Sequence, residues 1–519
     1  AAASNTAINY IQKSAGAALG VGSLAVPGYI LLDNTYGGTA GVGGTATSGY
    51  VNLSNAPTYA QSTLDGVLVS GALSSGAYAG TNAISINSVS GLLPVGKNNI
   101  TVSGALTAAT GNINLAGETL ASNGVKLAAN VSANSGSIDI VGVSSSNAGS
   151  GTGIYLNAGI QLASSANITM SGSVTSSTVL GPGIDMFASG NVISAGGNLR
   201  LNAFSANASA NTMYALRMGI SPVYLKSGGD IVISASNGAA TASLSAGVIA
   251  YGLVTNAGGT LTFQGSTLGA RVIATGTSVA NVASAAPTTS VDGGAGTGII
   301  LNGSASYTDG ANTYTGINAI GNISIVGRGA VGGIDDTSIL IKSSNGAVML
   351  TGATTTGVAV SDTALITGNS ISVIGTASGA AATVVSLKAM TINAGGANLS
   401  VLATGGTAGG STGITQSGAI TQAADGGSIT FTSNNKINQT GAISMAANTS
   451  GAPSAVTYDT TGGTSASSIV TGALTLATGS TSAINYAVKT AGAPITGSAI
   501  SMPGSITLDN TYGGTGGVG

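Results

Sequence analysis

The sequence predicts an all-β chain wound as a parallel β-helix, or β-solenoid, with coils of roughly 20–31 residues. Three observations predict this fold class. A short strand pattern recurs along the chain, its copies are evenly spaced, and the composition is dominated by small uncharged residues. A fixed period of roughly 20–50 residues indicates a stacked repeat architecture, and strands inside the period favour a solenoid.

The recurring pattern is a Gly, then a small or polar residue, then an apolar–x–apolar triplet. Alternation of this kind predicts a short strand with one buried face. Clear copies are GNINL at 111–115, GSIDI at 136–140, GNLRL at 197–201, GDIVI at 229–233, GTLTF at 259–263, GNISI at 321–325 and GSITL at 504–508, with ANITM at 166–170 as a variant.

The spacing of these copies predicts the coil length. Starts fall at positions 136, 166, 197, 229 and 259, so each copy follows the one before it after about 30 residues. The next start, at position 321, comes after twice that interval, which predicts two coils. GTGIYLN at 151–157 recurs as GTGIILN at 296–302, and this offset predicts close to five coils. At about 4.8 Å per coil, some 17 coils would form a rod about 80 Å long.

The composition suits such a rod and excludes several other classes. Of 519 residues 85 are Gly, and charged residues make up 5%, against about 25% in ordinary domains. Because stacked coils place like residues above one another, repeated charges would repel, so we expect few of them. The mean hydropathy of +0.44 argues against a disordered chain. We expect no nucleic-acid partner, because no basic face is present, and no membrane-spanning segment, because no apolar run is long enough.

A long repeat joins the two ends of the chain. Residues 7–43 and 483–519 align without a gap, with 22 of 37 positions identical, and both contain LDNTYGGT. We interpret 1–476 as one long repeat unit of a continuous solenoid and 477–519 as the start of the next unit, a copy of 1–43. The repeat-junction motif comprises Asp33, Asn34 and Tyr36 in the first copy and Asp509, Asn510 and Tyr512 in the second. Its Asp, Asn and Gly residues predict a turn that ends a coil.

Asn residues share one position of the strand pattern, at Asn112, Asn167, Asn198 and Asn322. An internal ladder of stacked amides and a set of ordinary turn residues are both compatible with this placement.

The repeats resemble those of a known class of bacterial proteins. GNINLAG, SGNVISAGGNLRLNA, GGDIVISA and GNISIVG are similar to coils of filamentous-haemagglutinin-like adhesins, large repetitive bacterial proteins exported by two-partner secretion or as autotransporter passengers. The resemblance lies in the form of the repeats and covers positions from about 80 to about 510. It implies a right-handed β-solenoid, an extracellular location on the bacterial cell surface, and a role in adhesion or biofilm formation.

Candidate chemistry is sparse. With no His and no Cys, Ser-His-Asp and Cys-His arrangements are excluded within this chain. Asp335 and Asp336, with Arg328 nearby, are the best acid–base candidates, but adjacent strand residues point to opposite faces and GGIDDTS at 332–338 is also typical of a turn. Tyr307 and Tyr314 lie in the polar segment SASYTDGANTYTG and are candidate glycan contacts. An insertion without a ligand is the alternative for that segment.

The sequence therefore predicts a structural and adhesive segment of a giant tandem-repeat surface fibre, without a catalytic, cofactor or metal site. The expected partners are neighbouring copies of itself, lateral copies, and cell-surface glycans or matrix. A homopolymeric extracellular sheath and a polysaccharide-active β-helix enzyme are the alternatives.

Overall fold

The chain forms a stack of β-coils. The computed structural model describes residues 7–11, 18–35, 65–78, 80–90, 97–119, 122–144, 151–175, 181–188, 190–206, 214–219, 222–237, 246–267, 296–303, 305–394, 397–406, 411–422, 427–446, 454–460, 468–476, 482–487, 494–501 and 504–509. Every regular element within these ranges is a β-strand. In this part of the chain, no helix has the length and apolar character needed to cross a membrane.

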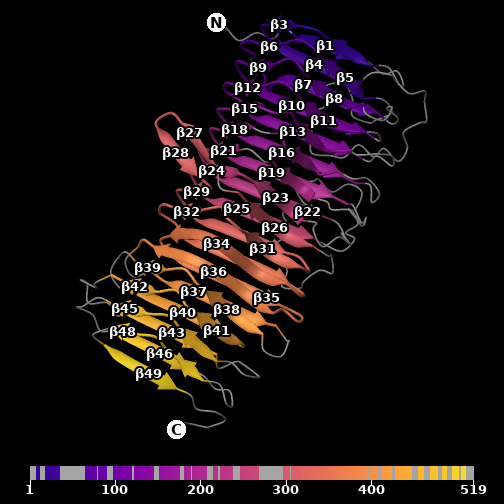
Figure 1. The fold of residues 1–519 in the computed structure, drawn as a ribbon. Coiled ribbons are helices and arrows are strands. Elements are labelled where there is room, and N and C mark those ends of the chain that lie inside the picture. The colour runs from indigo at the N-terminus through magenta and orange to yellow at the C-terminus, as the bar shows by residue number, and fades with distance from the viewer. Residues whose placement is uncertain are drawn as a thin grey trace.

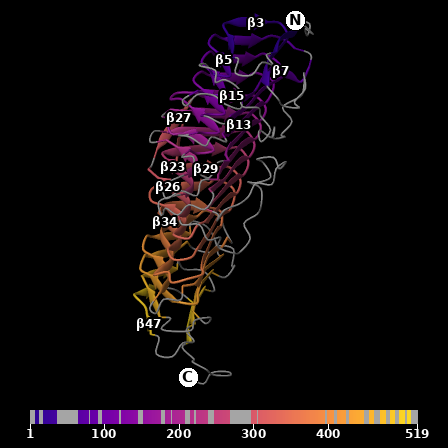
Figure 2. The same cartoon turned by 90° about the vertical axis from the view of Figure 1, so that its right-hand side faces the viewer.

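Successive coils stack in sequence order, so that the first and last strands lie at opposite ends of an elongated rod (Figures 1 and 2). The first wall of the rod is a parallel sheet of 17 strands, one from each coil. Its strands are β1 (Ala7–Ile11), β4 (Tyr29–Thr35), β7 (Asn82–Ser90), β10 (Asn112–Thr119), β13 (Ile138–Ser144), β16 (Ile168–Val174), β19 (Leu199–Ser205), β22 (Ile231–Asn237), β25 (Leu261–Thr267), β30 (Ile323–Arg328), β33 (Val348–Thr354), β35 (Ile371–Ala377), β37 (Leu399–Gly405), β40 (Gly427–Ser433), β43 (Ser454–Asp459), β46 (Ser482–Ala487) and β49 (Ser505–Asp509).

The second wall contains the strand that follows in each coil. Its strands are β2 (Leu19–Val21), β5 (Val67–Val69), β8 (Ile100–Val102), β11 (Val125–Leu127), β14 (Ile154–Leu156), β17 (Ile184–Met186), β20 (Tyr214–Met218), β23 (Ala246–Tyr251), β26 (Thr297–Asn302), β31 (Gly332–Asp336), the first parts of β34 (Val358–Gly368) and β36 (Thr383–Ile392), β38 (Thr412–Gln416), β41 (Lys436–Gln439), β44 (Ile469–Thr471) and β47 (Ile495–Thr496).

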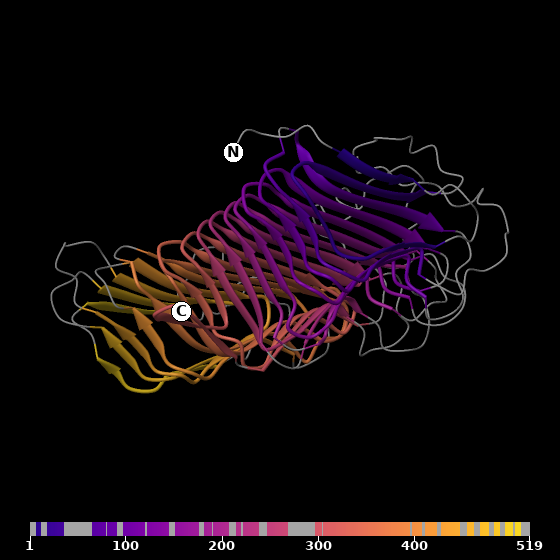
Figure 3. The ribbon, with the colours of Figure 1, turned by 90° about the horizontal axis from the view of Figure 1, so that it is seen from above.

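The third wall completes each coil, and it shares a 30-stranded sheet with the second wall through the long strands β34 and β36. Figure 3 shows the strands of successive coils following one another along the rod. The third-wall strands are β3 (Leu24–Val26), β6 (Leu73–Ser75), β9 (Leu106–Ala108), β12 (Val131–Ala133), β15 (Gln161–Ser164), β18 (Val192–Ala195), β21 (Val223–Ser227), β24 (Leu253–Ala257), β29 (Ile317–Ala319), β32 (Ile341–Ser343), the second parts of β34 and β36, β39 (Ile420–Gln422), β42 (Ile443–Met445), β45 (Leu474–Leu476) and β48 (Ile500–Ser501).

The core is a continuous apolar column, as the strand pattern predicts. In the first wall, the first apolar residue of each pattern lies directly on its equivalent in the next coil and is at most 1% exposed. This row contains Ile113, Ile138, Ile168, Leu199, Ile231, Leu261 and Ile323. The apolar–x–apolar triplets are therefore confirmed as strands with one face in the core.

Coil length varies more than the regular spacing predicts. The coil from Ala7 to its partner Tyr29 is clearly shorter than the coil from Leu199 to Ile231. A longer coil still is closed by the pairing of Leu261 with Ile323, which spans the whole doubled interval. The prediction of two coils in that interval is wrong, because Leu261 and Ile323 are direct partners in adjacent strands of the first wall.

The prediction of five coils between the two GTGI motifs is wrong as well. The row from Ile154 to Ile299 passes through Ile184, Leu216 and Val248, which makes four steps. A hairpin follows the second motif, before the chain reaches the third wall. It is antiparallel and consists of β27 (Ser306–Asp309) and β28 (Asn312–Thr315).

The turn predicted for LDNTYGGT at 32–39 is wrong for its first four residues, and 36–39 lie outside the described residues. Asp33, Asn34 and Thr35 continue β4 and pair with Asn87, Ser88 and Val89 of the next coil. Because pairing to the adjacent coil satisfies the backbone along the whole segment, the strand overrides the turn preference of Asp and Asn.

Glycine is required where the backbone of the first wall comes close to the backbone that leads into the second wall. A Cβ added to Gly142 in β13 would lie 2.0 Å from the carbonyl oxygen of Gly153. The residues stacked on either side of Gly142 in the first wall, Gly117 and Gly172, have the same close approach, at 2.2 and 2.1 Å from backbone oxygens. Glycine at these positions lets the two walls contact each other backbone to backbone.

Gly142→Val should destabilise the rod by about 2 kcal/mol or more, because a larger side chain forces the walls apart. Thermal unfolding followed by circular dichroism measures the effect. Gly20→Ala is the matched control, since a Cβ at Gly20 meets nothing within 4 Å. Equal unfolding midpoints for the two variants would contradict the close packing of these walls.

Candidate functional site

The hairpin β27–β28 lies against the outside of the third wall. In Figure 1 its salmon strands appear beside β21, and β28 also contacts β24. Tyr307 and Tyr314 are cross-strand partners, so they share one face of the hairpin. That face covers Tyr224 of β21, with ring centroids 4.0 Å apart for Tyr307 and 6.2 Å for Tyr314. Tyr224 points outward from its strand, yet it is only 1% exposed because the hairpin covers it.

Polar contacts fix the hairpin at its tip. Lys226 Nζ lies 2.6 Å from Asp309 Oδ2, and the Tyr224 hydroxyl donates a 3.3 Å hydrogen bond to the same oxygen. The hydrogen bond from Lys226 lowers the pKa of Asp309. Burial raises the pKa of Tyr224 to about 12, so its hydroxyl stays a donor at neutral pH. Gly310, with φ of +61°, supplies the left-handed residue in the two-residue turn.

The two predicted glycan-contact residues are thus brought together, but one side of the pair packs on the rod. Tyr307 and Tyr314 are partly exposed, while the hydroxyls of Thr308 and Thr313 occupy the opposite face of the hairpin. The sequence reasoning missed Tyr224. Its signal in the sequence is a large aromatic residue at an outward position of VYLKS, at 223–227, where a small polar residue is usual. Such a residue indicates that another part of the chain covers this position.

The repeat-junction residues lie at the two ends of the rod. Asp33 and Asn34 are buried in β4, and Asn34 Nδ2 donates a 2.6 Å hydrogen bond to Gly66 O. Asp509 is the last residue of β49 and is partly exposed. Tyr36, Asn510 and Tyr512 lie outside the described residues.

The two copies of the long repeat fold alike. Strands β46, β47, β48 and β49 repeat β1, β2, β3 and β4 in the same order and walls. Ile8 pairs with Ile30 in the first copy, and Ile484 pairs with Ile506 in the second, so each copy makes a short coil of the same length and register. In the first wall β4 is second and β49 is last of 17 strands, which places the copies 15 coils apart.

The predicted acid–base pair is divided between two sides of the second wall. Of the two readings for GGIDDTS at 332–338, the strand is confirmed for 332–336, which form β31, and the chain bends only at Thr337 and Ser338. Asp335 points outward and is partly exposed, whereas Asp336 is 0% exposed in the core. The two carboxylates therefore cannot act together on one substrate.

Asp336 has a different partner, which the sequence reasoning missed. It stacks directly on Asp362 of β34, which is 1% exposed. Each Oδ1 accepts backbone N–H bonds, from Ser338 and Ile339 for Asp336 and from Ala364 for Asp362. Each Oδ2 is buried without a hydrogen-bond partner. Desolvation raises the pKa of Asp336 to about 7, and desolvation together with the charge of Asp336 raises the pKa of Asp362 well above its ordinary value.

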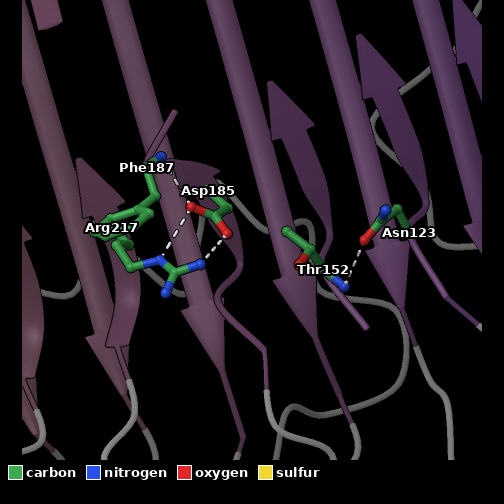
Figure 4. Close-up of polar contacts among 5 residues, drawn as sticks. All are labelled: Asn123, Thr152, Asp185, Phe187 and Arg217. Carbon is green, nitrogen blue, oxygen red and sulfur yellow. Dashed lines mark hydrogen bonds and ion pairs between the residues drawn. The ribbon is translucent and has the colours of Figure 1, made fainter. Parts of the chain in front are cut away.

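Charged residues on the outside of the second wall have favourable neighbours in the adjacent coil. Asp185 and Arg217 are register partners, and the Arg217 guanidinium donates two hydrogen bonds to Asp185, at 3.1 and 2.5 Å, while lying over the Phe187 ring (Figure 4). Elsewhere on the same wall, Lys126 lies over the ring of its register partner Tyr155. In both pairs the register partner of the charged residue is an opposite charge or an aromatic ring. A like charge at that position would repel it.

Amide side chains link the coils in two ways. The pattern Asn residues lie at the corner before the first wall, where Asn167 Oδ1 accepts from the backbone N–H of Asn198 at 2.8 Å and Asn198 Oδ1 from that of Asp230 at 2.9 Å. The same bond joins Asn112 to Ser137 and Asn322 to Ala347. An internal amide ladder is built instead by the buried Gln416 and Gln439, with Gln439 Nε2 donating to Gln416 Oε1 at 3.0 Å.

Among the described residues, no group of three or more acidic side chains is placed to hold a metal ion. Comparison of the chain with protein-family models, curated proteins and solved structures found no match. Functional inference therefore depends on the geometry of the chain itself.

The Asp336–Asp362 pair should make the rod less stable as pH rises. Both folded-state pKa values lie above the value in the unfolded chain, so the folded state holds protons that the unfolded state releases. This stabilisation is complete below about pH 4 and is lost as pH rises through about 7 for Asp336. Asp336→Asn should therefore raise stability at pH 8 by roughly 2–4 kcal/mol relative to the parent, and change it little at pH 4.

Unfolding midpoints measured from pH 4 to 8 test this prediction. Asp335→Asn is the control, because the same change at a partly exposed outward position should have a smaller effect. A parent chain whose midpoint does not fall with pH, or an equal gain from both variants, would contradict a buried protonated pair.

Proposed function

We propose that this chain is a structural and adhesive segment of an extracellular fibre on the bacterial cell surface, built from tandem copies of a 15-coil unit. Residues 1–476 are one unit, and 477–519 begin the next. The observation that carries the proposal is the shared fold of the two repeat copies, with the same three walls and the same short coil. Because the second copy restores the coil with which the first unit begins, further units add to the rod without a change in cross-section.

The surface composition supports a mechanical and adhesive role. Charged residues make up only 5% of the chain, and Thr, Ser and Asn are common at the outward positions of the strands. Such a surface allows close packing against glycans, matrix or neighbouring rods without charge repulsion.

The hairpin β27–β28 is the best candidate for a ligand contact on this surface. It lies on the third wall, with the partly exposed Tyr307 and Tyr314 on the face that packs on Tyr224 and the hydroxyls of Thr308 and Thr313 on the outer face. The exposed edges of the Tyr rings and the polar outer face of the hairpin are suited to contact with sugars. The hairpin would therefore add a specific contact to an otherwise uniform rod.

A chain with two tandem units should form one rod of roughly twice the length. Each unit of 15 coils adds about 72 Å at about 4.8 Å per coil. Electron microscopy of the present chain and of residues 1–476 followed by 1–519 measures this difference. Two rods joined at an angle, or a globular second unit, would contradict tandem continuation.

Attachment to glycan-coated surfaces should depend on the hairpin. Tyr307→Ala combined with Tyr314→Ala should weaken attachment about tenfold, given about 0.5–1.5 kcal/mol for each aromatic contact. Tyr155→Ala removes a partly buried Tyr from the second wall and is the matched control. Binding measured on a glycan array with unfolding midpoints alongside separates lost contacts from lost folding; unchanged binding by the double variant would exclude the hairpin as the contact site.

A further inference from the structure

The three tyrosines between the hairpin β27–β28 and the rod form a cluster of oxidisable rings. Tyr224 and Tyr307 are stacked, with centroids 4.0 Å apart and 17° between the ring planes, and the Tyr314 centroid lies 6.2 Å from that of Tyr224. Carbon atoms of near-parallel rings at the shorter distance are in van der Waals contact. Because the chain has no Cys, the phenol rings are the groups at this contact that can be joined covalently.

The cluster is accessible from the hairpin side and closed on the rod side. Tyr307 and Tyr314 are partly exposed, whereas Tyr224 is 1% exposed. An oxidant in solution therefore removes an electron first from a tyrosine of the hairpin. Tyr224 can then give an electron to the oxidised ring of Tyr307, because the two rings are in contact.

Oxidation of Tyr224 also requires an acceptor for its hydroxyl proton. Burial raises the pKa of Tyr224 to about 12, so the phenol is protonated at neutral pH. The hydroxyl donates a hydrogen bond to Asp309 Oδ2 at 3.3 Å. The hydrogen bond from Lys226 lowers the pKa of Asp309, so this carboxylate is ionised and can take the proton when the electron leaves.

We propose that Tyr224 and Tyr307 are a site of oxidative cross-linking, at which a dityrosine joins the hairpin covalently to the third wall. The oxidant is hydrogen peroxide, acting through a peroxidase. Each phenol loses one electron and its hydroxyl proton, and the two radicals form a carbon–carbon bond between the ring carbons next to the hydroxyls. The hydrogen on each of these carbons then moves to the oxygen, which restores both phenols. The two electrons and two protons released reduce one peroxide to two water molecules.

The cross-link changes how the hairpin is held, and it goes beyond the proposed fibre function without depending on it. In the reduced chain, the hairpin is held by ring stacking and by the Lys226–Asp309 ion pair, whose side chains are 41% and 35% exposed. Salt screens an exposed ion pair of this kind. A carbon–carbon bond is not weakened by salt, so the oxidised hairpin stays on the third wall at high ionic strength.

Treatment of the full chain with a peroxidase and hydrogen peroxide tests the proposal. Dityrosine fluorescence should appear, and mass spectrometry after proteolysis should find a linked pair of peptides that contain residues 224 and 307. The mass of the pair should be lower by two hydrogen atoms than the sum of the two peptides. The yield per chain should not change on dilution, because both rings belong to one chain.

Tyr307→Phe and Tyr314→Phe are matched variants, because both residues lie on the same face of the hairpin and Phe keeps the ring that stacks. Tyr307→Phe should lower the yield of dityrosine about tenfold or more, since the remaining phenol of the hairpin lies farther from Tyr224. Tyr314→Phe should keep the link between 224 and 307, and Tyr224→Phe should remove it. Unfolding midpoints equal to that of the parent show that the variants fold.

Tyr29 and Tyr78 provide an internal comparison, since their rings are also stacked but their centroids are 5.6 Å apart. A product that links 29 with 78 and leaves 224 unlinked would overturn the proposal. Links formed only between separate chains, tyrosine oxidation without any link, or a dityrosine yield that Tyr224→Phe leaves unchanged would overturn it as well.

Discussion

Parallel backbone pairing between successive coils is the constraint on which the rest of the structure depends. Each coil must return every strand to the place of its predecessor, so equivalent residues lie directly above one another along the rod. This explains the apolar row from Ile113 to Ile323, the close contact at Gly142 and the pairing of Asp185 with Arg217. A residue is accepted at a position only if it tolerates its neighbours one coil before and after.

The sequence predicted the features that this stacking repeats in every coil. The strands with one buried face and the parallel solenoid follow from the short pattern and its spacing, and the low fraction of charged residues agrees with close stacking. Features that occur in only one coil could not be predicted from this repeating pattern. The interval from Leu261 to Ile323 is one coil. Such a long coil is tolerated because the entropic cost of closing a connection rises only slowly with its length. Asp33 and Asn34 form a strand because the adjacent coil pairs with them.

Contacts between segments distant in the chain were also beyond the reach of pattern analysis. Tyr307 and Tyr314 stood out as aromatics in a polar segment, but their stacking on Tyr224 depends on how the hairpin folds back across the third wall. Likewise Asp336 drew attention through its neighbour Asp335, whereas the structure pairs it with Asp362 in the next coil. Only when the length of this coil is known does the spacing between Asp336 and Asp362 indicate that the two carboxylates stack on each other.

The same stacking rule applies to the two copies of the long repeat. Inside the rod, the requirement for an in-register neighbour is met by the next coil of the chain, and apolar residues such as Ile30 become fully buried. Strand β49 repeats the apolar pattern of β4, with Ile506 and Leu508 at the places of Ile30 and Leu32. A repeat that restores its starting coil after 15 coils keeps the same arrangement of walls at the start of each copy. Periodicity on the scale of one coil builds the rod, and periodicity on the scale of the whole unit lets the rod continue.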